Sequence, residues 1–127
     1  MSLISFNKAT EPGIYDDLRI NLAAVLYVEG SRPDLVGHTT LHMLGQGEAV
    51  LALADSVGTV VSQINGLVAA RRHYLAATPE GGPSVVYISP HTVSYVRPNV
   101  PVSPEFWYVQ FVDGSEVRIA DPLPAGL

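Results

Sequence analysis

The four histidines of this chain carry the side chains best suited to bind a metal or move a proton. His38 and His42 are four residues apart in a segment that reads as a loop entering a strand, where such residues lie about 13 Å from each other. Two neighbouring arginines oppose a cation at His73, and His91 lies in an expected turn. No carboxylate stands at a zinc-like spacing from any of the four. We therefore expect no metal site and no cofactor.

Catalysis by a nucleophile has no recognisable motif in the sequence. The chain has no cysteine and no Gly-x-Ser-x-Gly elbow. Its glycine-rich runs lack the Lys-Ser/Thr pair of a phosphate-binding loop. Most of the twelve acidic residues fall in or beside expected turns, where Asp55 serves as a helix cap and Asp113 as part of a hairpin loop. We name no catalytic residue.

Arginine and aromatic side chains offer another kind of chemistry, the binding of a small anionic ligand such as a nucleotide. The planar guanidinium of arginine matches the geometry of phosphate, and an aromatic ring can stack on a nucleobase. One cationic group lies at the end of an expected helix, and a second combines arginines with Trp107 and Tyr108. The candidate ligand-binding residues are Arg71, Arg72, His73, Arg97, Tyr108 and Arg118.

Each of these side chains also has a structural interpretation. Arg71 and Arg72 complement the negative end of the helix dipole, and Arg118 can pair with its neighbours across strands. Trp107 is expected in the core. Ligand binding is therefore one alternative beside a purely structural role.

Composition limits the classes of partner. The 127 residues carry a net charge of −5, the wrong sign for a protein that neutralises phosphates, which disfavours nucleic acid. No apolar stretch approaches the roughly 20 residues of a membrane span, and no signal-peptide pattern opens the chain, so we expect a cytoplasmic protein with no membrane partner. Apolar residues make up 47% and charged residues only 15%. This low charge density indicates that part of the apolar surface contacts another subunit.

A repeated pattern runs through the chain. Residues 20–28 (INLAAVLYV) lie over residues 88–96 (ISPHTVSYV) at a constant offset of 68. Each copy continues into a hairpin that ends in Ala-Asp, at Asp55 and at Asp121. Because repeated modules are usually scaffolds that pack on each other, their shared residues report the fold and their differences report function.

The first copy predicts a short edge strand or arm over 3–6, a strand over 19–28 and a hairpin of strands 39–44 and 49–53. After this hairpin the apolar period changes from two to about 3.6, which predicts a helix over 56–76. We expect the apolar face of this helix to form an oligomer interface. The interface residues are Val57, Val61, Ile64, Leu67 and Val68.

The second copy predicts strands over 85–88, 92–97, 106–111 and 115–120. A two-residue turn in the last hairpin would place Glu116 opposite Phe111, on the most apolar face. A three-residue loop with glycine in the left-handed region instead pairs Val109 with Val117. We predict this second register, because a one-residue slip would move every side chain to the other face. Its outer face then contains Tyr108, Gln110, Glu116 and Arg118.

The order of these elements resembles the FlbD-like family of small flagellar and swarming-motility proteins. The resembling residues are Ile20-Asn21, Val25 and Asp55-Ser56-Val57 in the first copy, and Ile88-Ser89-Pro90, Val93, Asp113-Gly114 and Val117 in the second. The resemblance covers about half to two-thirds of the chain. It implies a small, non-catalytic β-meander module without a defined active site, here present twice.

We predict an α+β domain of two related antiparallel β-meander modules with one central helix. The first module spans 1–76, a linker spans 77–83 and the second module spans 84–127, within one compact domain. The predicted function is that of a non-catalytic, homo-oligomeric binding or assembly protein of bacterial or phage type. The alternatives are an oligomeric protein that sequesters a small anionic ligand, and an enzyme with unrecognised acidic catalytic residues.

Overall fold

The expected α+β fold, dominated by antiparallel strands, is confirmed by the structure, a computed structural model that describes residues 3–6, 18–30, 38–46, 50–81 and 85–127. The strands within these residues are β1 (Leu3–Phe6), β2 (Leu18–Asn21), β3 (Val25–Glu29), β4 (Thr39–Met43), β5 (Val50–Leu53), β6 (Leu75–Ala77), β7 (Val86–Ile88), β8 (Val93–Pro98), β9 (Phe106–Phe111) and β10 (Glu116–Ala120). The helices are α1 (Val57–Asn65) and the 3-10 helices η1 (Leu22–Ala24), η2 (Ala70–Arg72) and η3 (Pro90–Thr92).

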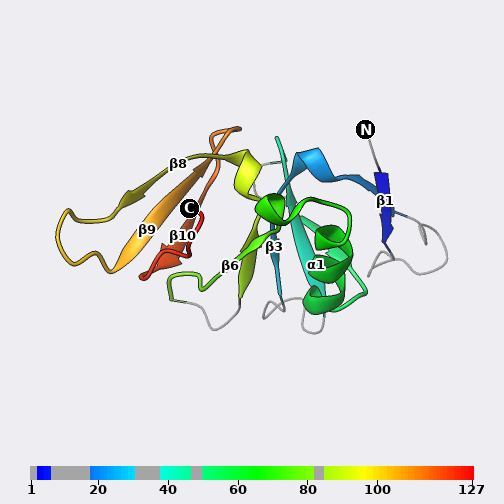
Figure 1. Ribbon diagram of the computed structural model, residues 1–127, viewed down its shortest axis with the longest axis horizontal. Coiled ribbons are helices and arrows are strands. Elements are labelled where there is room, and N and C mark those ends of the chain that lie inside the picture. The colour runs from blue at the N-terminus through cyan, green and yellow to red at the C-terminus, as the bar shows by residue number, and fades with distance from the viewer. Residues whose placement is uncertain (1–2, 7–17, 31–37, 47–49, 82–84) are drawn as a thin grey trace.

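Three antiparallel sheets contain these strands. The central sheet has the order β5-β4-β3-β7-β6, a second sheet has the order β10-β9-β8, and β1 pairs with β2. Along the long axis of the molecule β1 lies at one end and the sheet of β8, β9 and β10 at the other, with the central sheet between them (Figure 1). The two modules therefore follow each other along this axis.

The repeat in the sequence is reproduced element by element. Shifted by 68 residues, η1 falls on η3, β3 on β8 and β4 on β9. Val28 lies opposite Leu41 in the first module, and their counterparts Val96 and Val109 lie opposite each other in the second. Both strand pairs also have a register shift directly after their first residue pair. The two modules therefore share the register of this strand pair.

The predicted strand over 19–28 is interrupted by η1, which was not expected from the sequence. The Asn21 side chain accepts a hydrogen bond from the backbone N–H of Ala23 (3.1 Å), and this bond competes with extended pairing. The interruption separates β2 from β3, which belong to different sheets. Each module therefore contains a starting hairpin, a 3-10 turn and a three-stranded meander.

The starting hairpin of the second module is β6-β7, the counterpart of β1-β2. The predicted module boundary at residue 76 falls inside β6. The predicted linker 77–83 is attached to β10 by backbone hydrogen bonds from Glu80 N to Arg118 O (2.9 Å) and from Ala120 N to Thr78 O (2.8 Å). Residues 82 and 83 lie outside the described part of the chain.

Helix α1 is shorter than the predicted span of 56–76. Ser56 caps its first turn by accepting a hydrogen bond from Thr59 N (3.3 Å), and the helix ends at Asn65, before Gly66. The Asn65 side chain then accepts from Tyr74 N (2.9 Å), which holds the returning chain. The rest of the predicted span forms η2 and β6, because pairing with β7 outweighs the helical spacing of the apolar residues.

The last hairpin has the predicted register. Val109 lies opposite Val117, and Gly114 adopts the expected positive φ of 91° in the loop. Trp107, which was expected in the core, is only half-buried. Its indole N–H donates to Asp121 (2.9 Å), because a buried indole nitrogen would need an acceptor that the apolar core does not supply.

Two apolar cores stabilise the molecule. The first lies beneath α1 and joins β1 and β2 to β3, β4 and β5; it contains Phe6, Ile20, Val25, Val28, Leu41, Leu53, Val60, Val61, Ile64 and Tyr74. The second joins β6 and β7 to the sheet of β8, β9 and β10; it contains Leu26, Ala77, Val86, Ile88, Val109, Phe111 and Ile119. Among the described residues no helix is long and apolar enough to cross a membrane.

A pair of substitutions at the C-terminal end of α1 tests the first core. Ile64 is fully buried, so Ile64→Ala should lower the free energy of unfolding by about 2–5 kcal/mol. Leu67 is 63% exposed, and Leu67→Ala should change it by less than about 0.5 kcal/mol. Urea unfolding followed by circular dichroism measures both. Equal losses for the two variants would contradict this assignment of the buried face.

Candidate functional site

The outer face of the sheet of β8, β9 and β10 brings together three of the predicted ligand-binding residues. Arg97, Tyr108 and Arg118 lie opposite one another on the three adjacent strands. The guanidinium carbon of Arg97 lies 4.0 Å from the centre of the Tyr108 ring, and that of Arg118 lies 5.3 Å from it. These distances are typical of cation–π contacts. The row therefore combines two positive charges with one aromatic ring.

The neighbours of this row limit its positive charge. Arg118 also lies 5.5 Å from the centre of the Phe106 ring, which meets the Tyr108 ring edge-on. On its other side Arg118 forms an ion pair with Glu80 (3.7 Å) in which both side chains are largely exposed. An exposed pair of this kind contributes little stability and can be displaced by another anion. The row can therefore accept a phosphate or carboxylate group at modest cost.

The other predicted cationic group lies elsewhere. Arg71 and Arg72 belong to η2 and not to α1, so they do not complement the dipole of α1 as predicted. Both arginines are exposed, and His73 is half-buried at the end of η2. Arg72 lies near His91 of η3: burial first, and then the charge of Arg72, lowers the pKa of His91 below its usual value.

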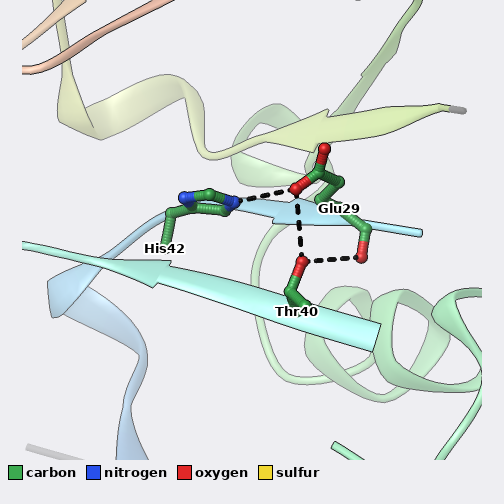
Figure 2. Close-up of polar contacts among 3 residues, drawn as sticks. All are labelled: Glu29, Thr40 and His42. Atoms are coloured by element: carbon green, nitrogen blue, oxygen red, sulfur yellow. Dashed lines mark hydrogen bonds and ion pairs between the residues drawn. The ribbon is translucent and has the colours of Figure 1, made fainter. Parts of the chain in front are cut away.

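A polar cluster that was not predicted links β3 to β4. Figure 2 shows Glu29 on β3 facing Thr40 and His42 on β4. The Glu29 carboxylate lies 3.1 Å from His42 Nε2 and accepts a hydrogen bond from the Thr40 hydroxyl (3.3 Å). The imidazole stacks on Tyr27, with 3.9 Å between ring centres, and Tyr27 stacks in turn on Phe111 of the second module.

The chemistry available to this cluster is that of a paired carboxylate and imidazole. Such a pair can hold or pass a proton, but a catalytic role also needs a reacting group within hydrogen-bond reach. The hydroxyl beside the carboxylate belongs to Thr40, which is fully buried. Within the described chain no three His, Asp or Glu side chains are grouped as metal ligands. We interpret the cluster as a polar link between two strands.

The polar cluster and the arginine row occupy equivalent positions in the two modules. Shifted by 68 residues, Glu29, Thr40 and His42 become Arg97, Tyr108 and Gln110. The first set lies mostly buried beside the module junction, whereas Arg97 is exposed on the outer sheet face. The same scaffold position is therefore acidic in one copy and basic in the other. The sequence alone does not reveal this difference in charge, because the bulges in β3 and β8 determine which residues lie opposite each other.

Two further groups have unusual environments. The Tyr74 hydroxyl is buried, and burial raises its pKa to about 12, against a smaller opposing effect of the nearby Ser89 side chain. Desolvation alone would raise the pKa of Asp113, but hydrogen bonds from Ser115 and from Gly45 N (2.9 Å) lower it below its usual value. Asp113 thereby ties the hairpin turn of the second module to that of the first.

Comparison with protein-family models, with curated proteins and with solved structures finds no match for this chain.

The pKa of His91 tests the position of η2. Replacing Arg72 by glutamine should raise this pKa toward the ordinary value of 6.5 without reaching it, because burial remains. The folded chain protonates His91 less readily than the unfolded chain does. The contribution of His91 to stability is therefore present above pH 6.5 and is lost as the pH falls below it. NMR titration of the imidazole signal measures the shift. Arg71→Gln is the matched control, and equal shifts in both variants would contradict the proximity of Arg72.

Proposed function

We propose that this chain is a non-catalytic, self-assembling protein of bacterial or phage type. The observation that carries the proposal is the edge of β8. This strand pairs with β9 on one side, and among the described residues no strand pairs with its other side. A strand at the edge of a sheet presents backbone N–H and C=O groups that can pair with another chain. The resemblance of both modules to FlbD-like proteins supports the bacterial type.

Exposed apolar side chains lie on and next to this edge. Tyr95 on β8 is 51% exposed, and Val102 in the following loop is 80% exposed. Val100 is exposed in the same loop, and Val112 is exposed directly after β9. Exposed large apolar groups of this kind favour contact with a partner.

The predicted helical interface receives less support. Val61 and Ile64 are buried in the first core of this chain, so their side chains are already committed. Val57 and Val68 are half-buried, and Leu67 is the exposed member of the set. We therefore place the assembly surface at β8 and not on α1.

Light scattering tests self-assembly. We expect a mass above the 13.6 kDa of one chain, falling toward it on dilution through the micromolar range. Val102→Asp should shift this equilibrium toward the single chain, because burying an unpaired carboxylate is costly. Leu67→Asp, at another exposed position just after α1, should leave it unchanged. A single-chain mass at every concentration would overturn the proposal.

A second candidate function is the binding of a small anionic ligand, and the convergence of Arg97 and Arg118 on Tyr108 favours it. A phosphate can pair with a guanidinium while a base stacks on a half-buried aromatic ring. The Glu80 carboxylate already occupies one such position beside Arg118. The ligand would replace this ion pair with a closer charge pair.

Thermal unfolding with adenosine 5′-monophosphate and with ribose 5-phosphate tests this candidate. Binding at a hundredfold excess over the dissociation constant would stabilise the fold by about 2.7 kcal/mol and raise the melting temperature. The double variant Arg97→Gln, Arg118→Gln should abolish the rise, whereas Arg71→Gln should preserve it. An unchanged melting temperature with both compounds would rule these ligands out, and loss of the effect in Arg71→Gln would place the site at η2.

A further inference from the structure

The contact between the two modules is a strand pairing. β3, the second strand of the first module, pairs antiparallel with β7, the first strand of the second module. Tyr27 lies opposite Ile88, and Val28 lies opposite Tyr87. Backbone hydrogen bonds from Ser89 N to Leu26 O (3.0 Å) and from Gly30 N to Val85 O (3.2 Å) extend the pairing at both ends. The backbone N–H and C=O groups of β3 that face β7 therefore belong to residues 26, 28 and 30.

The repeat assigns a counterpart to each side of this contact. The counterpart of β3 is β8, and the counterpart of β7 is β2. In the described part of the chain β8 pairs with β9 alone, and β2 pairs with β1 alone. Among the residues that the structure describes, the first module therefore has a strand on its β3 edge, and the second module has no equivalent strand on its β8 edge. By the offset of the repeat, the strand equivalent to β7 is β2.

In this conformation β2 cannot pair with the edge of β8 in the same chain. β8 lies at one end of the long axis, whereas the sheet that contains β2 also contains β1, which lies at the other end (Figure 1). The β2 strand that would complete β8 must come from a second copy.

We propose that the edge of β8 receives β2 of a second copy of this chain, in the same antiparallel register as the β3-β7 contact. Tyr95 then lies opposite Ile20 of the second copy, as Tyr27 lies opposite Ile88 within one chain. This inference rests on the proposed self-assembly and specifies its geometry. The contact joins two different surfaces, so it repeats from copy to copy and ends as a closed ring or a filament.

The side chains at the edge of β8 are compatible with this pairing. The edge residues equivalent to 26, 28 and 30 are Ser94, Val96 and Pro98. The backbone N–H groups of Ser94 and Val96 can donate hydrogen bonds, and their carbonyl groups can accept them. Pro98 ends the strand because it has no N–H. Tyr95 is half-exposed in the single chain and would be covered by the arriving copy.

The environment of Tyr27 indicates how Tyr95 would be covered. Tyr27 stacks on Phe111 across the module junction, with 5.5 Å between ring centres. The counterpart of Phe111 in the first module is Met43, which is half-buried. Tyr95 therefore contacts Met43 of the second copy, and a thioether against an aromatic ring is a favourable apolar contact.

Disulfide trapping tests the register directly, because the natural chain has no cysteine. The Tyr27–Ile88 pair lies between hydrogen-bonded pairs, so its Cα atoms are about 4.5 Å apart, a separation that a disulfide can span. Mixing an Ile20→Cys chain with a Tyr95→Cys chain under mild oxidation should give a covalent dimer that contains one of each. Ile20→Cys with Arg97→Cys is the matched control and should give much less, and Tyr27→Cys with Ile88→Cys in one chain is the internal benchmark.

A second variant does not depend on substituting a buried residue. Val96→Pro removes the N–H that points away from β9, and an edge strand tolerates proline at such a position, so the fold should be retained by circular dichroism. Self-association should weaken about tenfold or more through the lost hydrogen bond and the steric conflict with β2.

The outcomes separate this inference from the proposed function. A trapped Ile20–Tyr95 dimer together with weaker assembly of Val96→Pro supports the register. Assembly without that dimer, or a dimer formed by Tyr95→Cys chains alone, overturns the β2-β8 contact and leaves self-assembly standing. A single chain at every concentration overturns both.

Discussion

Strand β3 is hydrogen-bonded along both edges, to β4 of its own module and to β7 of the other. Its Val25 and Val28 contribute to the core beneath α1, while Leu26 belongs to the core of the second module. The bulge after Val25 makes this possible, because its extra residue lets Val25 and Val28, three positions apart, face the same core. A change that weakened β3 would therefore loosen both cores at once.

Local patterns in the sequence were sufficient for the parts of the fold that depend on neighbouring residues. The alternation around Asp113-Gly114 determined the register of the last hairpin, and the repeat predicted two related modules. The end of α1 could not be predicted, because Leu75 fits a helical spacing and a strand equally well, and only its pairing with Ile88 decides between them. Long-range pairing is not encoded in local periodicity.

The candidate sites show the same limit. Arg97, Tyr108 and Arg118 could be placed on one face from strand alternation alone. The hydrogen bond between Glu29 and His42 could not, because the bulge in β3 shifts which residues of β3 and β4 lie opposite each other. The predicted place of Arg71 and Arg72 at the end of the long helix was wrong for a related reason, since α1 stops before Gly66 and both arginines belong to η2. The correct assignments lie on regular strands, whereas the incorrect ones depend on a bulge or on the end of a helix.

The β3-β7 pairing has an evolutionary consequence. A one-module ancestor would have carried both halves of this contact, a starting strand like β2 or β7 and an open edge like β3 or β8, on every copy. Gene duplication with fusion would then have made one contact intramolecular, which raises its effective concentration without any new interaction. The β3 edge is a joint within one chain, and β3 carries the half-buried Glu29; the β8 edge is exposed, and β8 carries Arg97 at the equivalent position.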